Sequence, residues 1–162
     1  TQEFGKHENV MIISGDNDFI QLQKMSNVKQ FSPITKKIVS TDDAHRWTME
    51  KIFKGCGSDG VPNILSPDNA IAEGIRQKPM TKKKMDSWYN SEDPKMGMNE
   101  ETYRNFIRNK KLVDLTETPQ NIKDEIINKY EAQDPQKNKG KVFPYLVQKR
   151  CRLLVESVQE FI

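Results

Sequence analysis

The sequence predicts a fold that starts as α/β and becomes mostly α, and two observations carry this prediction. Short apolar runs rich in β-branched residues, separated by turn residues, occupy the first 39 residues, as expected for the strands of a small sheet. Beyond Val39 this pattern stops, and apolar side chains recur at helical spacing instead. We therefore expect the end of a parallel-sheet core with a small hairpin, followed by helices.

Three runs are expected to form the sheet. The first covers residues 10–14 and is rich in valine and isoleucine, which predicts a strand buried on both faces, as in a parallel sheet. Turn residues follow it and lead into a short helix over residues 18–25. The other two strands are expected over residues 28–31 and 37–39, joined into a hairpin by a turn at residues 32–35.

The first long helix is expected between residue 40 and Gly55, because glycine suits a helix end. Ser40 or Thr41 can cap its start, and Asp42 and Asp43 then stand in its first turn. Acidic groups there favour the helix, since they face the positive end of its dipole.

A loop over residues 56–65 follows, and two starts remain open for the next helix. Ser66-Pro67-Asp68 is one signature of a helix start, and Thr81, capping a helix over residues 82–89, is the other. Later helices are expected over residues 100–110, from Thr118-Pro119 onward, and over residues 144–161. The chain thus divides into residues 1–39, 40–90 and 91–162.

Composition limits the class of protein. Of the 162 residues 35% are hydrophobic and 30% are charged, so the core is modest. The sequence shows no apolar run of about 18 residues and no leader, so we expect no membrane contact. Cys56 and Cys151 are expected to be free thiols in the cytoplasm. The chain begins with Thr1, and we expect a piece of a longer protein.

Basic residues gather in three parts of the chain: between Arg76 and Lys84, between Arg104 and Lys111, and between Lys137 and Arg152. Such clusters suit the phosphate backbone of a nucleic acid. A solvated helical face would show the same pattern, so charge alone leaves both interpretations open.

Asp16 and Asp18 are the first candidates for chemistry. They follow the first predicted strand, and the carboxyl ends of strands in open α/β sheets are where ligands bind. Two carboxylates this close repel each other and favour a cation, and hard oxygen ligands favour Mg²⁺. The other interpretation is a solvated turn in which one aspartate caps the next helix.

The second candidate is the glycine-rich loop G-C-G-S-D-G-V-P-N-I, which starts at Gly55. Glycines let backbone amides approach a phosphate closely, and Asp59 is the carboxylate of this loop. Taken by itself the loop could equally be an ordinary connection between two helices.

Together the two motifs resemble those of the 5′-nuclease, or flap-endonuclease, family. The strand ends in S-G-D-x-D-F, and about forty residues later a helix ends in G-x-x-x-D-x-V-P-x-I. The runs F-I-Q-L-Q-K, N-V-K-Q-F-S-P and K-V-F-P-Y-L-V are similar to the ribonuclease H branch found in T-even-like phages. The resemblance covers most of the chain and is loose between Leu65 and Asn90.

The resemblance implies a hydrolase that cleaves phosphodiesters at the 5′ end of RNA or DNA on a template, or at a 5′ flap, and so removes primers during replication. It implies that Asp16, Asp18 and Asp59 are catalytic residues and metal ligands for two Mg²⁺ ions, which Mn²⁺ can replace. The remaining carboxylates of such a site match no run in this chain, so we expect its active site to be incomplete and the chain by itself to be inactive.

The resemblance also implies partners. We expect a monomer in the cytoplasm, that of the host cell for a phage protein, which binds duplex or flap DNA and RNA–DNA hybrids and contacts single-stranded-DNA-binding protein. Residues 40–90 would form a helix-hairpin-helix-like DNA-binding element, and residues 91–162 a helical subdomain. The expected DNA-binding residues are Lys36, Lys37, Lys54, Gly57, Ser58, Gly60, Val61, Asn63, Lys82, Lys83 and Lys84.

Two positions depart from the family pattern. Cys56 stands where the family has an aspartate, and a thiol is a poor ligand for Mg²⁺. Gly60 replaces the usual asparagine, which puts the potassium site of that loop in doubt. A non-catalytic module that binds duplex DNA, or a platform that binds a replication protein, is therefore the alternative function.

Overall fold

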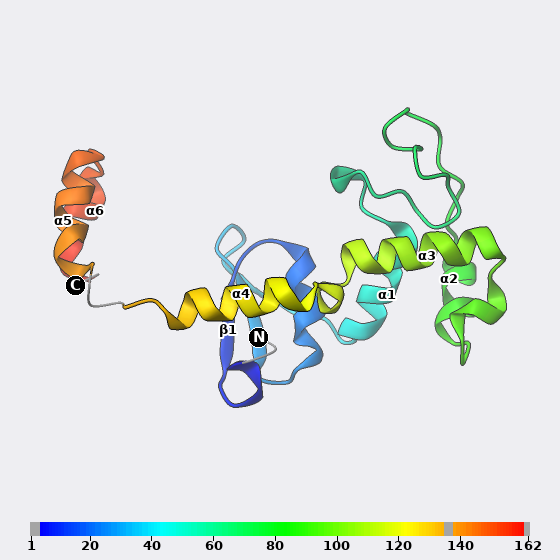
Figure 1. Ribbon diagram of the computed structural model, residues 1–162, viewed down its shortest axis with the longest axis horizontal. Helices are drawn as coiled ribbons and strands as arrows, with labels where there is room; N and C mark the ends of the chain where they lie inside the picture. The colour runs from blue at the N-terminus through cyan, green and yellow to red at the C-terminus, as the bar shows by residue number, and fades with distance from the viewer. Residues whose placement is uncertain (1–3, 135–137, 161–162) are drawn as a thin grey trace. The chain divides into compact units, whose positions relative to one another are not determined.

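The computed structural model describes residues 4–134 and 138–160. Contacts within the chain divide it into two units, Thr1–Thr118 and Pro119–Ile162, and each is described by itself (Figure 1). In the described part of the chain no helix is long and apolar enough to cross a membrane. The fold is mixed α/β with a small sheet and is mostly helical, as the sequence predicts. The division at residues 39 and 90 stays a prediction.

The sheet of the first unit has the order β1-β2-β3. Strand β1 (Val10–Ile13) pairs parallel with β2 (Val28–Ser32), so that Val10 faces Val28. Strand β3 (Lys37–Val39) returns antiparallel to β2, with Ile38 opposite Phe31. The predicted strands and their hairpin are confirmed, and the predicted short helix after β1 is a 3-10 helix over Asn17–Lys24.

One expectation about β1 is wrong, because this strand is not buried on both faces. Met11 and Ile13 are 50% and 64% exposed. Side chains alternate across a strand, and the register places Val10 and Ile12 on the face that also carries the buried Val28. The β-branched run marked a strand correctly, but it could not show that only one face is covered.

Helix α1 (Ala44–Lys54) begins later than expected, because Asp43 caps it instead of Ser40 or Thr41. The backbone N–H of Arg46 donates to Asp43 Oδ1 at 2.8 Å, and this bond is the main cause of the lowered pKa of Asp43. The predicted end at Gly55 is confirmed. Gly55 has φ 69°, and a Cβ there would lie 2.3 Å from the Val61 carbonyl oxygen, so no other residue fits.

The helix-hairpin-helix-like element is not confirmed. Of the two candidate starts, Thr81 caps helix α2 (Lys82–Tyr89), whereas residues 68–74 form turns. The Ser66 hydroxyl is not available as a cap, because it donates to Asn63 Oδ1 and accepts from the Lys78 N–H. A long loop therefore joins α1 to α2, with a short 3-10 helix at Gly57–Asp59.

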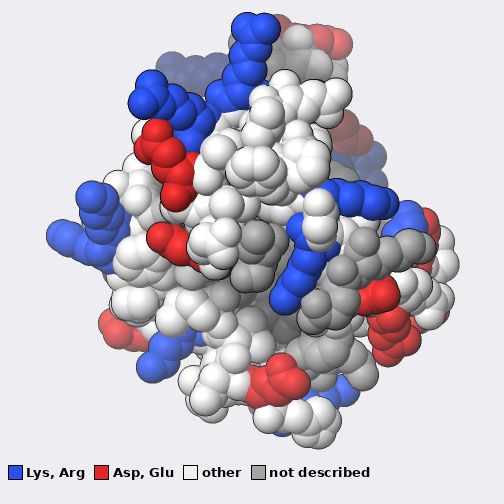
Figure 2. All heavy atoms as spheres, turned by 90° about the vertical axis from the view of Figure 1, so that its left-hand side faces the viewer, with Lys and Arg blue, Asp and Glu red and all other residues white. Residues whose placement is uncertain are grey.

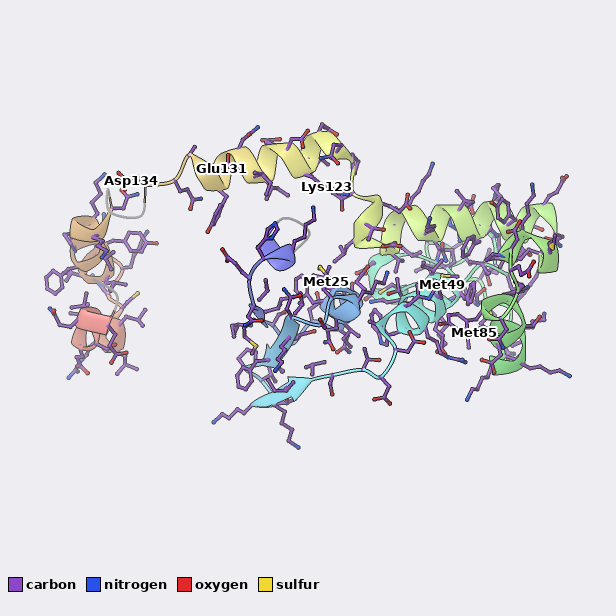
Figure 3. All side chains as sticks on the ribbon, turned by 90° about the horizontal axis from the view of Figure 1, so that it is seen from below. Met25, Met49, Met85, Lys123, Glu131 and Asp134 are labelled. Atoms are coloured by element: carbon purple, nitrogen blue, oxygen red, sulfur yellow. The ribbon has the colours of Figure 1, made fainter. Side chains whose placement is uncertain are left out.

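Helix α3 (Glu100–Val113) closes the core of the first unit and lies alongside α1 (Figure 1). Between them and α2, the Phe53 ring lies 5.5 Å from the Trp88 ring and 5.8 Å from the Phe106 ring, centroid to centroid. Met49 and Met85 pack into the same cluster (Figure 3). The buried residues of this core are Ile52, Phe53, Ile64, Met85, Trp88 and Phe106.

Two buried asparagines fasten α3 to the loop after α1. Asn105 Nδ2 donates to the carbonyls of Ile64 and Ser66 at 3.1 and 3.2 Å. Asn109 Nδ2 donates to the carbonyls of Ile52 and Pro62, both at 2.9 Å. Since buried carbonyls need donors, these amides hold a loop that has little regular structure of its own.

The second unit consists of α4 (Gln120–Glu131), α5 (Lys139–Gln148) and α6 (Arg152–Glu156). The start of α4 after Pro119 is as predicted. Its apolar stripe is exposed, with Ile122 at 44% and Ile126 at 59%.

The single helix expected over residues 144–161 is wrong. Helix α5 already starts at Lys139, and Arg150 with φ 55° ends it. The Cys151 N–H bonds to the Leu146 carbonyl and the Arg150 N–H to that of Val147, the two bonds of a Schellman motif. Glycine usually occupies this position of the motif, so the arginine gave no signal in the sequence that the helix ends here. Phe161, the last residue of the expected helix, lies outside the described residues.

Replacing Asn109 by leucine should lower the free energy of unfolding by about 2–4 kcal/mol, because two buried carbonyls lose their donor. Urea denaturation followed by tryptophan fluorescence measures this. Asn121→Leu on the exposed surface of α4 is the control and should change the stability by less than about 0.5 kcal/mol. A similarly small loss for Asn109→Leu would contradict the assigned role.

Candidate metal and nucleic-acid site

The turn after β1 is built from its own side chains. Ser14 Oγ accepts from the Asp16 N–H at 3.1 Å, and Asp16 Oδ1 accepts from the Asp18 N–H at 2.9 Å. Asp16 is exposed and caps the 3-10 helix Asn17–Lys24. The carboxylates of Asp16 and Asp18 thus start from one tight turn at the carboxyl end of a parallel strand.

Asp18 forms an ion pair with the ammonium group of Lys51, which comes from α1. This ammonium group also lies 5.3 Å from the centroid of the Trp47 ring, within range of a cation–π interaction. The lysine side chain is only 19% exposed. Sequence reasoning missed this contact, because Lys51 fitted the helical spacing of α1 and no local signal connects it with a residue 33 positions earlier.

Gln30 supports the turn from β2 and was also missed. Its Nε2 donates to the carbonyls of Ser14 and Asp16 at 2.9 and 2.7 Å. The side chain is fully buried, and its Oε1 atom has no hydrogen-bond partner. A glutamine at an inward position of a strand was the signal that could have revealed it, since such a residue needs buried partners.

The donors fit Mg²⁺ in kind but do not assemble a complete site. Carboxylate oxygens suit this ion. Among residues 4–134 and 138–160, however, no three histidine, cysteine, aspartate or glutamate side chains gather closely enough to hold a metal. Asp59 is exposed and accepts from Ser58 Oγ at 3.4 Å, and that hydroxyl also contacts Cys56 Sγ at 3.1 Å. The assignment of Asp16, Asp18 and Asp59 as ligands stays a prediction.

The glycine-rich loop exposes one side and buries the other. A β-bridge pairs Cys56 with Val61, and Gly60 takes the left-handed conformation with φ 73°. Val61 and Asn63 are 8% and 7% exposed, and Asn63 Nδ2 donates to the Lys78 carbonyl. Their side chains therefore hold the loop together. Contact with a ligand would fall to the exposed members, Gly57, Ser58, Asp59 and Gly60.

The predicted DNA-binding lysines are all exposed, but they lie on separate elements. Lys36 and Lys37 stand at the hairpin turn. Lys54 ends α1 and pairs with Glu50 at 2.9 Å, which is the main cause of the lowered pKa of Glu50. The remaining three, Lys82, Lys83 and Lys84, form the first turn of α2.

Charges of both signs share the surface. Figure 2 shows Lys and Arg side chains beside Asp and Glu side chains on the face that it presents. In the first unit, opposite charges also pair directly, among them Arg46 with Asp86 and Arg104 with Asp68. Since exposed pairs of this kind exchange easily with other ions, they leave basic groups available for an anionic partner.

Two comparisons place the chain among known proteins. Residues 43–161 match the family model "T4 RNase H, C terminal". The chain is also 33% identical over 158 residues to the ribonuclease H of Enterobacteria phage T4, an alignment that covers 94% of this chain and 52% of that protein. The chain therefore spans about half the length of the curated relative that it matches.

Replacing Gln30 by methionine should lower the free energy of unfolding by about 1–3 kcal/mol and shift the backbone amide NMR signals of residues 15–18. Gln21→Met is the matched control. Gln21 is also buried and makes two hydrogen bonds, to the Val113 carbonyl and from the Leu115 N–H. It should lose similar stability without moving those signals. Unchanged signals in Gln30→Met would contradict the role assigned to Gln30.

Proposed function

We propose that this chain supplies the C-terminal part of a metal-dependent 5′-nuclease. The premise is that the chain belongs to the T4 RNase H C-terminal family of flap-endonuclease-type nucleases. Such an enzyme would remove RNA primers and 5′ flaps during DNA replication, in the cytoplasm of a host cell. The observation that carries the proposal is the turn with Asp16 and Asp18 at the carboxyl end of a parallel strand.

Residues of this chain would bind the metal and position its ligands. Asp16, Asp18 and Asp59 would hold Mg²⁺, which when bound activates water and stabilises the leaving oxygen of a phosphodiester. Gln30 fixes the backbone of the turn, so the carboxylates keep their direction. Lys51 balances the charge of Asp18. To bind a metal ion, Asp18 would have to release this ammonium group.

The interface with nucleic acid would be built from backbone amides and lysines. The exposed Gly57 and Ser58 would present main-chain amides to a phosphate, whereas the Gly60 N–H already donates to the Gly57 carbonyl at 3.3 Å. The three lysines in the first turn of α2 support this proposal for a physical reason. Positive charges there oppose the helix dipole and cost stability, so their gathering is better explained by an anionic partner than by the helix itself.

We expect the 162 residues by themselves to leave nucleic acid uncut, because three aspartates on two separate loops supply too few carboxylates for two metal ions. A labelled 5′-flap duplex and an RNA–DNA hybrid, incubated with Mg²⁺ or Mn²⁺, test this expectation. Efficient cleavage that disappears in Asp16→Asn would show instead that this chain holds a complete catalytic site.

Duplex binding gives a second prediction. Changing Lys82, Lys83 and Lys84 together to glutamine should weaken binding on every sequence and reduce the slope of log affinity against log salt by about 2–3. The melting temperature should stay equal or rise, because the dipole of α2 is relieved of three opposing charges. Fluorescence anisotropy at several salt concentrations and a thermal melt measure the two effects.

A triple variant of Lys6, Lys24 and Lys29 to glutamine is the control, because these exposed lysines lie in the same unit and carry the same total charge. It should change the slope much less. An equal loss in both triple variants would mean that only net charge matters and that α2 is not part of the interface.

The alternative is a duplex-binding module without catalysis, and the Lys51–Asp18 pair favours it, because a lysine already compensates the charge of this candidate ligand. Manganese binding separates the two functions. Broadening of the amide NMR signals of residues 15–18 by substoichiometric Mn²⁺ favours the nuclease, whereas unchanged signals favour the module. Contact with single-stranded-DNA-binding protein remains a proposal, for which the exposed Ile122 and Ile126 of α4 are the first residues to replace.

A further inference from the structure

We propose that Arg104 and Arg108 of α3 form a binding site for one phosphate of a nucleic-acid backbone, and that Asp68 competes with the phosphate for this site. The inference rests on the proposed duplex binding and adds a site that the sequence motifs do not contain. Arg104 Nη2 donates to both carboxylate oxygens of Asp68 at 3.0 Å. Arg108 Nη1 pairs with Asp68 Oδ1.

The two guanidinium groups converge on one point because of the helix on which they stand. Residues four positions apart lie on the same face of a helix. Asn105 Oδ1 accepts from Arg104 Nε at 3.2 Å, and Asn109 Oδ1 accepts from Arg108 Nε at 3.0 Å. These asparagines are 1% and 0% exposed. Arg104 Nη2 and Arg108 Nη1 also donate to Asn105 Oδ1, at 2.9 and 3.4 Å. The buried amides thus fix both guanidinium groups, and the same two nitrogens hold the carboxylate of Asp68, whose place an anion would take.

The site is also placed beside the loop of the proposed interface. The same asparagines donate to carbonyls of that loop, and Arg108 Nη2 donates to the Pro62 carbonyl at 3.3 Å. The position of the arginine pair relative to the glycine-rich loop is therefore set by buried hydrogen bonds. A backbone that contacts Gly57 and Ser58 would have a second fixed anchor on the same unit.

Charge and exposure indicate that the carboxylate can be exchanged. Two guanidinium groups and one carboxylate leave one positive charge in excess. The side chains of Arg104 and Asp68 are 63% and 56% exposed, and such exposed pairs contribute little stability. A phosphate can offer oxygens to Arg104 Nη2 and Arg108 Nη1 as the carboxylate of Asp68 does. A phosphodiester can therefore take the position that Asp68 holds in the free protein.

The opposite interpretation is a purely structural clamp, in which Asp68 ties its turn to α3. The two interpretations differ in the sign of one effect. If Asp68 only stabilises the fold or orients the arginines, then Asp68→Asn weakens duplex binding. If Asp68 competes with the phosphate, then Asp68→Asn strengthens it, because the neutral amide leaves both guanidinium groups free for the backbone.

The experiment uses the 162-residue chain and a fluorescein-labelled DNA duplex, with affinity measured by anisotropy at fixed salt. Asp68→Asn should bind about two- to fivefold more tightly than the unchanged chain, the range expected for loss of one exposed ion pair. Glu125→Gln on α4 is the control, because it also breaks an exposed pair, that of Glu125 with Lys129, and adds one positive charge outside the proposed interface. Its gain should be clearly smaller. Thermal melts confirm that each variant is folded.

A double-variant cycle then tests the arginine. In the presence of Arg104→Gln, the gain from Asp68→Asn should fall to that of the Glu125→Gln control, and the salt slope should decrease by about 1. Arg104 is chosen because Arg108 also supports the loop. Weaker or unchanged binding by Asp68→Asn overturns the inference, as does a gain that persists without Arg104.

The proposed function can fail separately. If neither the unchanged chain nor Asp68→Asn binds the duplex, then the proposal of duplex binding is wrong, and so is the proposed phosphate site. If the unchanged chain binds and Asp68→Asn shows no gain over Glu125→Gln, only the phosphate site is wrong.

Discussion

The hydrogen bonds from Asn105 and Asn109 are the constraint on which much of the first unit depends. The segment between α1 and α2 has only short turns of its own, yet its carbonyls are buried and need donors. Two amides on successive turns of α3 supply donors to the carbonyls of Ile64, Ser66 and Pro62 in this segment. The outer sides of the same residues hold Arg104 and Arg108. One pair of buried side chains thus sets both the loop of the candidate interface and the arginine pair beside it.

Electrostatics explains how this unit tolerates its charged groups. Asp18 is paired with Lys51, Lys54 with Glu50, and Arg104 with Asp68. Each of these pairs joins a group that the proposed function would use to a counter-charge on the same chain. The Arg104–Asp68 pair is exposed, and such pairs contribute little stability, so the free protein can be balanced here and still offer charges to a phosphate backbone. The Asp18–Lys51 pair is less exposed, with the lysine at 19%.

The sequence predicted more of the fold than of the site. The strands, their hairpin, the end of α1 at Gly55 and the start of α2 after Thr81 all follow local rules of turn and cap chemistry. The errors lie where tertiary contacts decide. Ser66 had a capping signature, but its hydroxyl binds Asn63 and Lys78 instead. Arg150 is a local error instead, because it ends α5 through a Schellman motif in a conformation that usually requires glycine.

The sequence by itself determined the family, the order of the elements and the two motifs with Asp16, Asp18 and Asp59, because these depend on residues close together in the chain. Only the tertiary structure decided that Lys51 meets Asp18, that Gln30 supports the turn of Asp16 and Asp18, and that Arg104 and Arg108 share Asp68. These contacts join residues between 14 and 40 positions apart. No local pattern encodes such a contact, since packing of the whole unit selects it.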